Sequence, residues 1–315
     1  MTNPEARPLL ELRGLYKSFG AVQVLHDVDL SIHAGEVTAL VGDNGAGKST
    51  LVKCVSGIYA VDSGEFRFDG TPVSIHSPRD AGSLGIEVVY QDLALCDNLD
   101  IVQNMFLGRE IRRGFVLDDP TMEQKAAETL AGLAVRTVKS VRQQVASLSG
   151  GQRQTVAIAK AVLWNSRVVI LDEPTAALGV AQTAQVLELV RRLADNGLAV
   201  LLISHNMNDV FAVSDRIAAL YLGRMVAQVK ATDVTHGQVV ELITAGRSGN
   251  LGLPPQAEVT NGVGANGAGA NGVGANATGV GASGAGASGA DAAGADAAGV
   301  DATGAGANET NGVDR

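Results

Sequence analysis

The stretch GDNGAGKST, Gly42–Thr50, decides the fold of this chain. It satisfies the pattern G-x-x-x-x-G-K-[ST], with glycines at positions 42 and 47 followed by Lys48 and Ser49. The apolar run VTALV (37–41) comes directly before it, and the helix-like pattern STLVKCVSGI runs on from its end. A strand, a glycine-rich loop and a helix in this order turn backbone N–H groups inward on a phosphate, and the helix N-terminus adds a positive dipole end. We therefore predict a phosphate-binding loop, with Lys48 directed at the β- and γ-phosphates and the Ser49 hydroxyl at Mg²⁺.

Three further apolar runs have the length of buried strands, namely IEVVY (86–90), VVIL (168–171) and LAVLLI (198–203). Helix-like stretches lie between them, such as VAQTAQVLELVRRLADNG, in which Gly197 is a C-cap signal. Buried strands that alternate with helices favour a mostly parallel sheet covered on both faces. The predicted fold class is therefore α/β, with a P-loop NTPase core.

The flanking patterns predict two smaller subdomains. VDLSI (28–32) alternates, and FRFDGTPVSI contains Asp69-Gly70 as a hairpin turn, which indicates an N-terminal antiparallel β subdomain. Residues 93–147 lack strong strand runs and are predicted to be mainly helical. We expect a nucleotide-binding domain over residues 7–247, with a helical subdomain inserted at about residues 93–160.

The composition changes sharply near Leu253. From Asn261 onward the chain falls into loose pentads such as NGVGA, GASGA and DAAGA, without an aromatic residue, leucine or lysine. Such a segment cannot bury enough apolar area to offset its ordering entropy, so residues 253–315 are predicted to be a disordered, low-complexity tail rich in Gly, Ala and Asn. A silk-like or collagen-like assembly is the alternative, although the repeats lack proline and a strict Gly-X-Y period. Deleting residues 255–315 is expected to leave folding and activity unchanged.

Charge and composition exclude several classes of protein. The net charge of −9 argues against a nucleic-acid partner. The two cysteines, Cys54 and Cys96, have neither disulfide nor metal spacing, which favours a reducing compartment. The longest apolar runs fall far below the ~20 residues that span a bilayer, and the N-terminus MTNPEARPLLELRG lacks a signal core. We expect a soluble cytoplasmic protein whose membrane role, if any, comes through a partner.

Polar side chains suited to phosphate chemistry follow three of the predicted strands. Ligands of open α/β sheets bind at the carboxyl ends of the strands, so these side chains are expected near the phosphate loop. Asp172 is expected to hold Mg²⁺ through water, and Gln91 to offer it an amide oxygen. Glu173 is expected to polarise the attacking water as general base, and His205 to reach the γ-phosphate. Phe19, in YKSFG, is a candidate stacking platform for a purine base, although its place in a core fits equally.

A second glycine pair, in SLSGGQRQ (147–154), lies before another helix-like run. The motifs GDNGAGKST, YQD, LSGGQ, VVILDEPT and ISH, in this order, resemble the ATP-binding cassette ATPases over Leu9 to about Gly246. The resemblance implies ATP and Mg²⁺ as cofactors, and a head-to-tail homodimer that holds each ATP between one chain's phosphate loop and the other's LSGGQ. The residues it implies for a chain's own ATP are Phe19, Gly42, Asn44, Gly45, Ala46, Gly47, Lys48, Ser49 and Thr50. Those it implies for the partner's ATP are Ser149, Gly150, Gly151 and Gln152; for catalysis, Glu173 and His205; and for Mg²⁺, Ser49, Gln91 and Asp172.

Longer stretches carry a finer resemblance. GDNGAGKSTLVK, VVYQDLALCDNLDIVQNMFLGRE and LDEPTAALGV are similar to the ATPases of bacterial importers for ribose, xylose, fructose and galactose. The partners so implied are a second copy of this chain, a multi-span sugar permease and, indirectly, a secreted sugar-binding protein, with no nucleic acid. The implied location is peripheral, on the inner face of the cell membrane. Residues from about Asp92 to Gly108 are expected to carry the groove that grips a cytoplasmic helix of the permease.

One departure from the wider family concerns the residues after the acidic pair. Most cassettes read SALD there, with an aspartate that crosses to the opposite site, whereas this chain reads AALG and has Gly179. This looks like the sugar-import group's own variant, since Glu173 and His205 are intact.

Three alternatives to sugar import stay open. The first is another kind of importer. The second is an exporter, although exporter cassettes usually carry an acidic-glycine segment where this chain has SVRQQVAS. The third is a soluble cassette ATPase acting on ribosomes or in DNA repair, although these usually hold two cassettes. The identity of the sugar is not encoded, because the permease and the binding protein choose it.

Overall fold

The central element of the fold is a six-stranded sheet. The computed structural model describes residues 7–133 and 138–247. The strand order of the sheet is β12-β11-β3-β10-β9-β6. Its bounds are Arg224–Lys230 for β12, Arg216–Tyr221 for β11, Val37–Val41 for β3, Ala199–Ile203 for β10, Val168–Asp172 for β9 and Ile86–Val89 for β6. All neighbouring pairs are parallel except β11 with β12.

The four predicted buried strands are β3, β6, β9 and β10, and the mostly parallel sheet is confirmed. Every residue of β3 and of β10 is buried. Continuous apolar runs of this kind suit strands whose two faces are both covered by other elements.

A second, antiparallel sheet forms the N-terminal part, as predicted. Its order is β2-β1-β4-β5, with bounds Val22–Ile32, Leu10–Phe19, Ser63–Phe68 and Thr71–Val73. Asp69 and Gly70 make the turn between β4 and β5, with φ of 51° and 67°. Two central residues with positive φ match the twist of the flanking strands, which explains why an Asp-Gly pair marks this hairpin.

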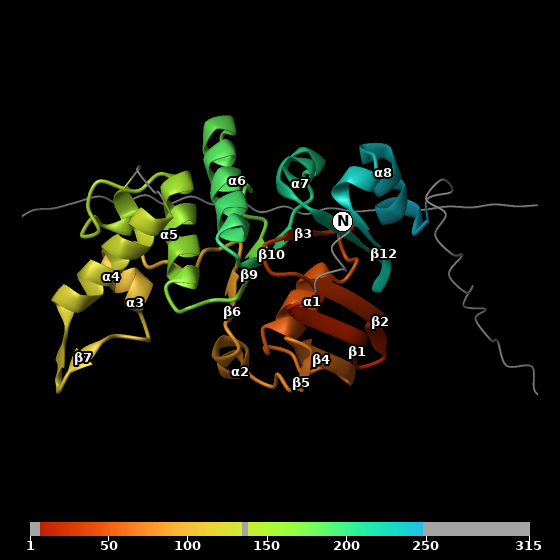
Figure 1. The fold of residues 1–315 in the computed structure, drawn as a ribbon, viewed down its shortest axis with the longest axis horizontal. Helices are drawn as coiled ribbons and strands as arrows, with labels where there is room; N and C mark the ends of the chain where they lie inside the picture. The colour runs from red at the N-terminus through yellow and green to blue at the C-terminus, as the bar shows by residue number, and fades with distance from the viewer. Residues whose placement is uncertain (1–6, 134–137, 248–315) are drawn as a thin grey trace, which may run out of the picture. The chain divides into compact units, whose positions relative to one another are not determined.

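Helices cover the two faces of the central sheet (Figure 1). Leu40 of β3 packs in a cluster with Leu51 and Val55 of α1 (Lys48–Val55) and with the N-terminal sheet. Its neighbours Ala39 and Val41 face the other way, toward α7 (Met207–Val213) and α8 (His236–Ala245). The remaining elements of this part are α2 (Pro78–Ser83), α6 (Val180–Asp195) and the short helix η2 (Ala231–Asp233).

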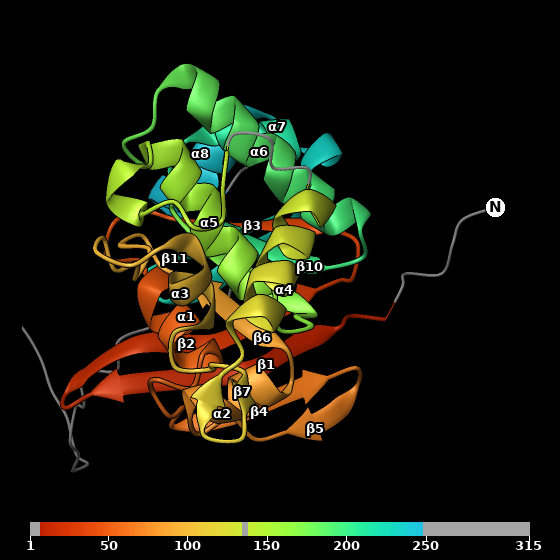
Figure 2. The same cartoon turned by 90° about the vertical axis from the view of Figure 1, so that its left-hand side faces the viewer.

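The segment predicted to be helical contains α3 (Ile101–Phe106), α4 (Asp119–Gly132), η1 (Val145–Ser147) and α5 (Gly150–Val162). Figures 1 and 2 show α3, α4 and α5 gathered beside one another. The segment also contains a hairpin of β7 (Arg112–Arg113) and β8 (Val116–Leu117), which the sequence analysis did not predict because two-residue strands leave no periodic pattern. The predicted tail, 253–315, lies outside the described residues. Over residues 7–133 and 138–247, no helix combines the length and apolarity needed to cross a membrane.

Candidate nucleotide site

The glycine-rich loop joins the end of β3 to the start of α1. Gly45 and Gly47 have φ of 82° and 105°, a region that L-residues with a side chain rarely adopt. A Cβ on Gly42 would overlap the carbonyl oxygen of Leu220, so the loop lies too close to the β11 strand end for any larger residue. The sequence therefore folds here into a narrow turn that leads directly into the N-terminus of α1.

Lys48, the first residue of α1, folds back over this loop. Its Nζ donates hydrogen bonds to the carbonyl oxygens of Gly42, at 2.7 Å, and Asp43, at 3.0 Å. Burial lowers the pKa of Lys48, while the nearby carboxylates of Glu173, Asp43 and Asp172 act in the opposite direction. A partly desolvated ammonium attracts a phosphate more strongly than a hydrated one, whereas the nearby carboxylates call for a cation between them and a polyanion.

A cleft of about 520 Å³ opens over the loop. Most of the predicted site residues line it, although they come from four separate parts of the chain: Asn44, Gly45, Gly47, Lys48, Ser49, Thr50, Gln91, Asp172, Glu173 and His205. Three predicted ATP-binding residues, Phe19, Gly42 and Ala46, are not among the lining residues. Two lining residues, Val24 and Ile203, were not predicted, because apolar strand residues carry no signal that separates a cleft wall from a core.

The predicted stacking residue lies at the end of the β1–β2 hairpin. Phe19 is the last residue of β1 and pairs with Val22 across the hairpin, while Val24 of the same hairpin lines the cleft. Phe19 is 43% exposed, and its ring meets that of Tyr59 edge to face, with centroids 5.1 Å apart. An exposed ring on this hairpin is available for stacking, so the assignment of Phe19 stays a prediction.

Asp172 and Glu173 follow one another at the carboxyl end of β9. Burial raises the pKa of Asp172, the neighbouring carboxylate of Glu173 raises it further, and Lys48 opposes both. Glu173 has φ of 51°, and its backbone N–H donates to the carbonyl oxygen of Ile203 at 3.0 Å. The left-handed conformation directs two successive carboxylates into one cleft, which a regular strand would send to opposite faces.

His205 follows β10, the strand that pairs with β9. Its Nδ1 lies 2.7 Å from Oε2 of Glu173, and the histidine side chain is 73% exposed while that of Glu173 is 15% exposed. The imidazole therefore holds a mostly buried carboxylate and leaves its own other edge open to the cleft.

The donor set for a metal consists of oxygen atoms. The Ser49 hydroxyl, the Gln91 amide and the Asp172 carboxylate all line the one cleft. No cluster of three or more His, Cys, Asp and Glu side chains among the described residues could cage a metal. Few protein oxygens, next to a phosphate-binding loop, fit Mg²⁺, which keeps waters and takes its remaining ligands from substrate phosphates.

The second glycine pair lies elsewhere. Ser149 is the N-cap of α5 and forms a capping box with Gln152: the Ser149 N–H donates to Oε1 of Gln152 at 2.9 Å, and the Gln152 N–H to Oγ of Ser149 at 3.4 Å. None of the four predicted signature residues, 149–152, is among those that line the cleft. A chain thus carries a prepared helix N-terminus apart from its own phosphate loop.

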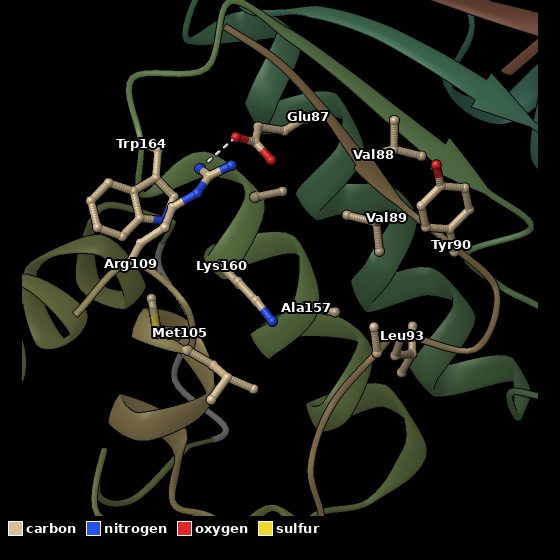
Figure 3. A pocket seen from close by; sticks show the side chains of 13 residues that line it. Glu87, Val88, Val89, Tyr90, Leu93, Met105, Arg109, Ala157, Lys160 and Trp164 are labelled. Carbon is tan, nitrogen blue, oxygen red and sulfur yellow. Dashed lines mark hydrogen bonds and ion pairs between the residues drawn. The ribbon is translucent and has the colours of Figure 1, made fainter. Parts of the chain in front are cut away.

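A smaller pocket of about 230 Å³ lies between β6, α3 and α5 (Figure 3). Its wall combines polar side chains with apolar ones, and the apolar ones include Leu93, Met105 and Trp164. Arg109 donates to Oε1 of Glu87 at 2.7 Å, and its guanidinium lies 5.5 Å from the centre of the Trp164 ring.

One cation of this pocket lacks such pairing. Figure 3 shows the ammonium of Lys160 directed into the pocket. Burial lowers the pKa of Lys160, and no described residue forms an ion pair with it. The pocket therefore offers apolar side chains beside one positive charge that has no ion-pair partner among the described residues, a feature that the sequence did not predict.

Known proteins resemble this chain over its described part. The model of the ABC transporter family matches residues 25–176. The chain is 45% identical, over 247 residues, to a fructose import ATP-binding protein, FrcA, of Rhizobium meliloti, which covers 76% of this chain and 95% of the relative. It is 44% identical, over 245 residues, to a xylose/arabinose import ATP-binding protein, XylG, of Sulfolobus acidocaldarius, which covers 78% of this chain and 97% of the relative.

Solved structures give the same picture of the fold. The structure of cbiO1 from Clostridium perfringens, part of the ABC transporter complex cbiONQ, superposes with a TM-score of 0.64 at 26% identity, over 75% of this chain and 93% of that one. A nucleotide-free ATP-binding cassette from an ABC transporter also gives a TM-score of 0.64, at 24% identity, over 71% of this chain and 91% of that one.

Proposed function

This chain belongs to the ABC transporter family of ATP-binding subunits, and on that premise we propose that it hydrolyses ATP to drive a membrane permease that imports a monosaccharide. The observation that carries the proposal is the cleft in which Lys48 and Ser49 of the phosphate loop meet the paired Glu173 and His205. A phosphate cradle beside a held carboxylate suits hydrolysis of a phosphoanhydride. The 44–45% identity to sugar import ATP-binding proteins supports the choice of solute class.

In the proposed reaction, the loop N–H groups and Lys48 hold the β- and γ-phosphates of ATP. Ser49, Gln91 and Asp172 would hold Mg²⁺, which would supply positive charge beside the phosphate oxygens. Glu173 accepts a proton from the water whose oxygen bonds to the γ-phosphorus, and the bond to the bridging oxygen breaks as ADP leaves with the electron pair. His205 keeps the Glu173 carboxylate in place through the 2.7 Å contact.

The proposed active unit is a head-to-tail homodimer. Ser149 and the amides of Gly150 and Gly151 lie at a helix N-terminus that does not line the chain's own cleft, which supports their use on the ATP of a second copy. Each ATP then joins two chains, and hydrolysis removes the shared γ-phosphate and allows the dimer to open. We infer that this opening and closing moves the permease.

The pocket of Figure 3 is the proposed seat of the permease. Its apolar side chains and the Lys160 ammonium, which has no ion-pair partner among the described residues, suit a cytoplasmic permease helix with apolar side chains and one carboxylate. The pocket begins at β6, whose end leads to Gln91 in the cleft, so the proposed seat and the nucleotide site share one short segment. The chain would act on the inner face of the membrane, beside a permease that takes its sugar from a secreted binding protein.

Substitution of the proposed general base tests this function. Glu173→Gln should abolish turnover while ATP still binds, because the amide cannot accept the proton. Glu128→Gln, an exposed position on α4, is the matched control and should keep the wild-type rate. Undiminished ATPase activity in Glu173→Gln would overturn the assignment. Uptake of single radiolabelled sugars in a strain that lacks this gene would identify the solute, and uptake equal to wild type for every monosaccharide would reject sugar import.

A further inference from the structure

The turn that follows Glu173 is tightly fixed. Ala177 has φ of 59°, a second left-handed conformation within five residues of Glu173. Two backbone hydrogen bonds close the turn, from the Ala176 N–H to the Glu173 carbonyl at 3.1 Å and from the Leu178 N–H to the Thr175 carbonyl at 3.3 Å. The Thr175 hydroxyl also donates to Oδ2 of the buried Asp209 at 2.7 Å. A non-glycine residue keeps a left-handed conformation only where its surroundings enforce it. We therefore expect the backbone of this turn to be rigid.

The far end of this turn lies directly on the two signature glycines. A Cβ built on Gly150 would lie 3.1 Å from Cδ2 of Leu178, and one on Gly151 would lie 3.1 Å from Cβ of Gln182. Contacts this short are tighter than most Cβ contacts in proteins, so a side chain at either glycine would require Leu178 or Gln182 to shift by a few tenths of an ångström. Leu178 and Gln182 therefore pack closely beside the two glycines. Oε1 of Gln182 accepts a hydrogen bond from the Gly179 N–H at 3.4 Å, which fixes the Gln182 side chain over α5.

Gly179 makes no comparable contact. A Cβ at this position would meet nothing within 4 Å, and Gly179 has no side chain to reach another group. The ordered connection from the catalytic carboxylate therefore runs inside the chain, from Glu173 through Leu178 and Gln182 to the start of α5.

We propose that Leu178 and Gln182 are positioning residues that hold the signature of their own chain in place for the ATP bound by the partner chain. The inference rests on the proposed head-to-tail dimer. It has an unusual consequence: these two residues closely follow the Glu173 of one ATP site, yet their loss impairs the other site. The catalytic carboxylate of one site and the signature of the other are thereby fixed to one rigid turn.

The first experiment measures ATP-driven dimerisation in the Glu173→Gln background, which retains ATP. Leu178→Ala and Gln182→Ala should each weaken dimerisation by about tenfold, while the affinity of the single chain for ATP stays unchanged; displacements of about 1 Å have effects of this size or larger. The matched controls on α6 are Gln185→Ala, which is exposed, and Leu187→Ala, which is partly buried against the same core. The conservative change Leu178→Met, which keeps a side chain of similar volume at this position, should restore dimerisation. Dimerisation of Leu178→Ala and Gln182→Ala equal to that of the controls would overturn the proposal.

The second experiment separates the two ATP sites with mixed dimers purified through two different affinity tags. When Leu178→Ala and Glu173→Gln are on different chains, the Leu178→Ala chain keeps its own carboxylate and meets an intact signature, so turnover is retained. When both changes are on one chain, the wild-type partner meets a displaced signature, and turnover should fall at least about tenfold below the first arrangement. Equal rates, or faster turnover with both changes on one chain, would overturn the proposal.

Ser149→Arg in place of Leu178→Ala distinguishes the two possible failures. One outcome is that turnover with Ser149→Arg differs between the two arrangements of the mixed dimer while turnover with Leu178→Ala does not. In that case the head-to-tail dimer is right and the role proposed for Leu178 and Gln182 is wrong. If Ser149→Arg also shows no dependence on the arrangement, the head-to-tail dimer of the proposed function is itself wrong.

Discussion

Nδ1 of His205 lies 2.7 Å from Oε2 of Glu173, across the carboxyl ends of two paired strands. The pairing of Ile203 with Asp172 in the β10–β9 register brings the two residues together, because each follows its strand by one or two positions. The contact joins an exposed imidazole to a carboxylate that is mostly buried. Among the described contacts of the Glu173 side chain, this is the hydrogen bond that can orient it toward a water molecule.

Loss of this contact should slow the chemical step. His205→Ala is expected to lower kcat by about 10²-fold with little change in ATP affinity, because the carboxylate loses its orientation but remains present. Steady-state ATPase kinetics and ATP titration measure the two effects separately. His76→Ala, an exposed histidine outside the cleft, is the control. An unchanged kcat in His205→Ala would contradict the role assigned to the pair.

The ionised carboxylate of Asp172 should lower the free energy of unfolding at neutral pH. Burial and Glu173 raise its pKa in the folded state, so folding favours its protonated form. The favourable contribution is present below the unfolded pKa of about 4 and is lost as the pH rises through the folded value. Asp172→Asn should therefore raise the Tm by a few degrees at pH 7, with a smaller difference from wild type near pH 4, while abolishing ATP hydrolysis.

Thermal unfolding without nucleotide at both pH values checks this expectation. Asp92→Asn, which removes an exposed carboxylate, is the control. A Tm of Asp172→Asn equal to or below that of wild type at pH 7 would show that the charge of Asp172 is not destabilising.

Trp164 can report directly on the proposed permease seat, because it is the single tryptophan of the chain and lines that pocket. A chain labelled with fluorotryptophan gives one ¹⁹F resonance, and this should shift when the unlabelled permease is added in detergent. Lys160→Glu should weaken the complex by at least about tenfold, because a like charge would then face the proposed permease carboxylate. Lys125→Glu, an exposed position on α4, should not. Permease binding without a shift of the Trp164 resonance would place the contact elsewhere.

The two cysteines should differ in reactivity. Cys54 lies on α1 and is fully buried, and burial raises its pKa to about 11. At pH 8 almost none of it is thiolate, so a disulfide reagent should modify Cys96 alone in the folded chain and both thiols after unfolding. Cys96→Ala removes the fast thiol and serves as the control. Two fast thiols in the folded wild type would contradict the burial of α1.

The sequence predicted those parts of the fold and site in which contiguous residues carry the signal. The loop at residues 42–50 and the acids after β9 belong to strand–loop–helix patterns that local chemistry explains. The position of β3 between β10 and β11 has no local pattern, because it follows from packing of segments far apart in the chain. The strands β11 and β12 were missed for a related reason: their Leu222-Gly223 turn has no motif of the Asp-Gly kind.

Two features of the site also needed the structure. Leu178 lies against Gly150 at the start of α5, and nothing in either local sequence predicts that these two segments are close together. In the sequence, Lys160 looks like any other residue of a helix. Only the fold shows that it faces a pocket with apolar side chains and has no ion-pair partner among the described residues. Whether a charged side chain has an ion-pair partner depends on which residues surround it in the folded chain, and the sequence alone does not give that arrangement.

The central claim is that one ATP is shared between two copies of the chain, and its most direct test is the mass of the protein in solution with ATP. In the Glu173→Gln background, light scattering should give the mass of a dimer with ATP and of a monomer without it. Adding Ser149→Arg should keep the chain monomeric with ATP, while equilibrium titration shows nearly unchanged ATP binding to the single chain. An ATP-driven dimer that survives Ser149→Arg would contradict the claim.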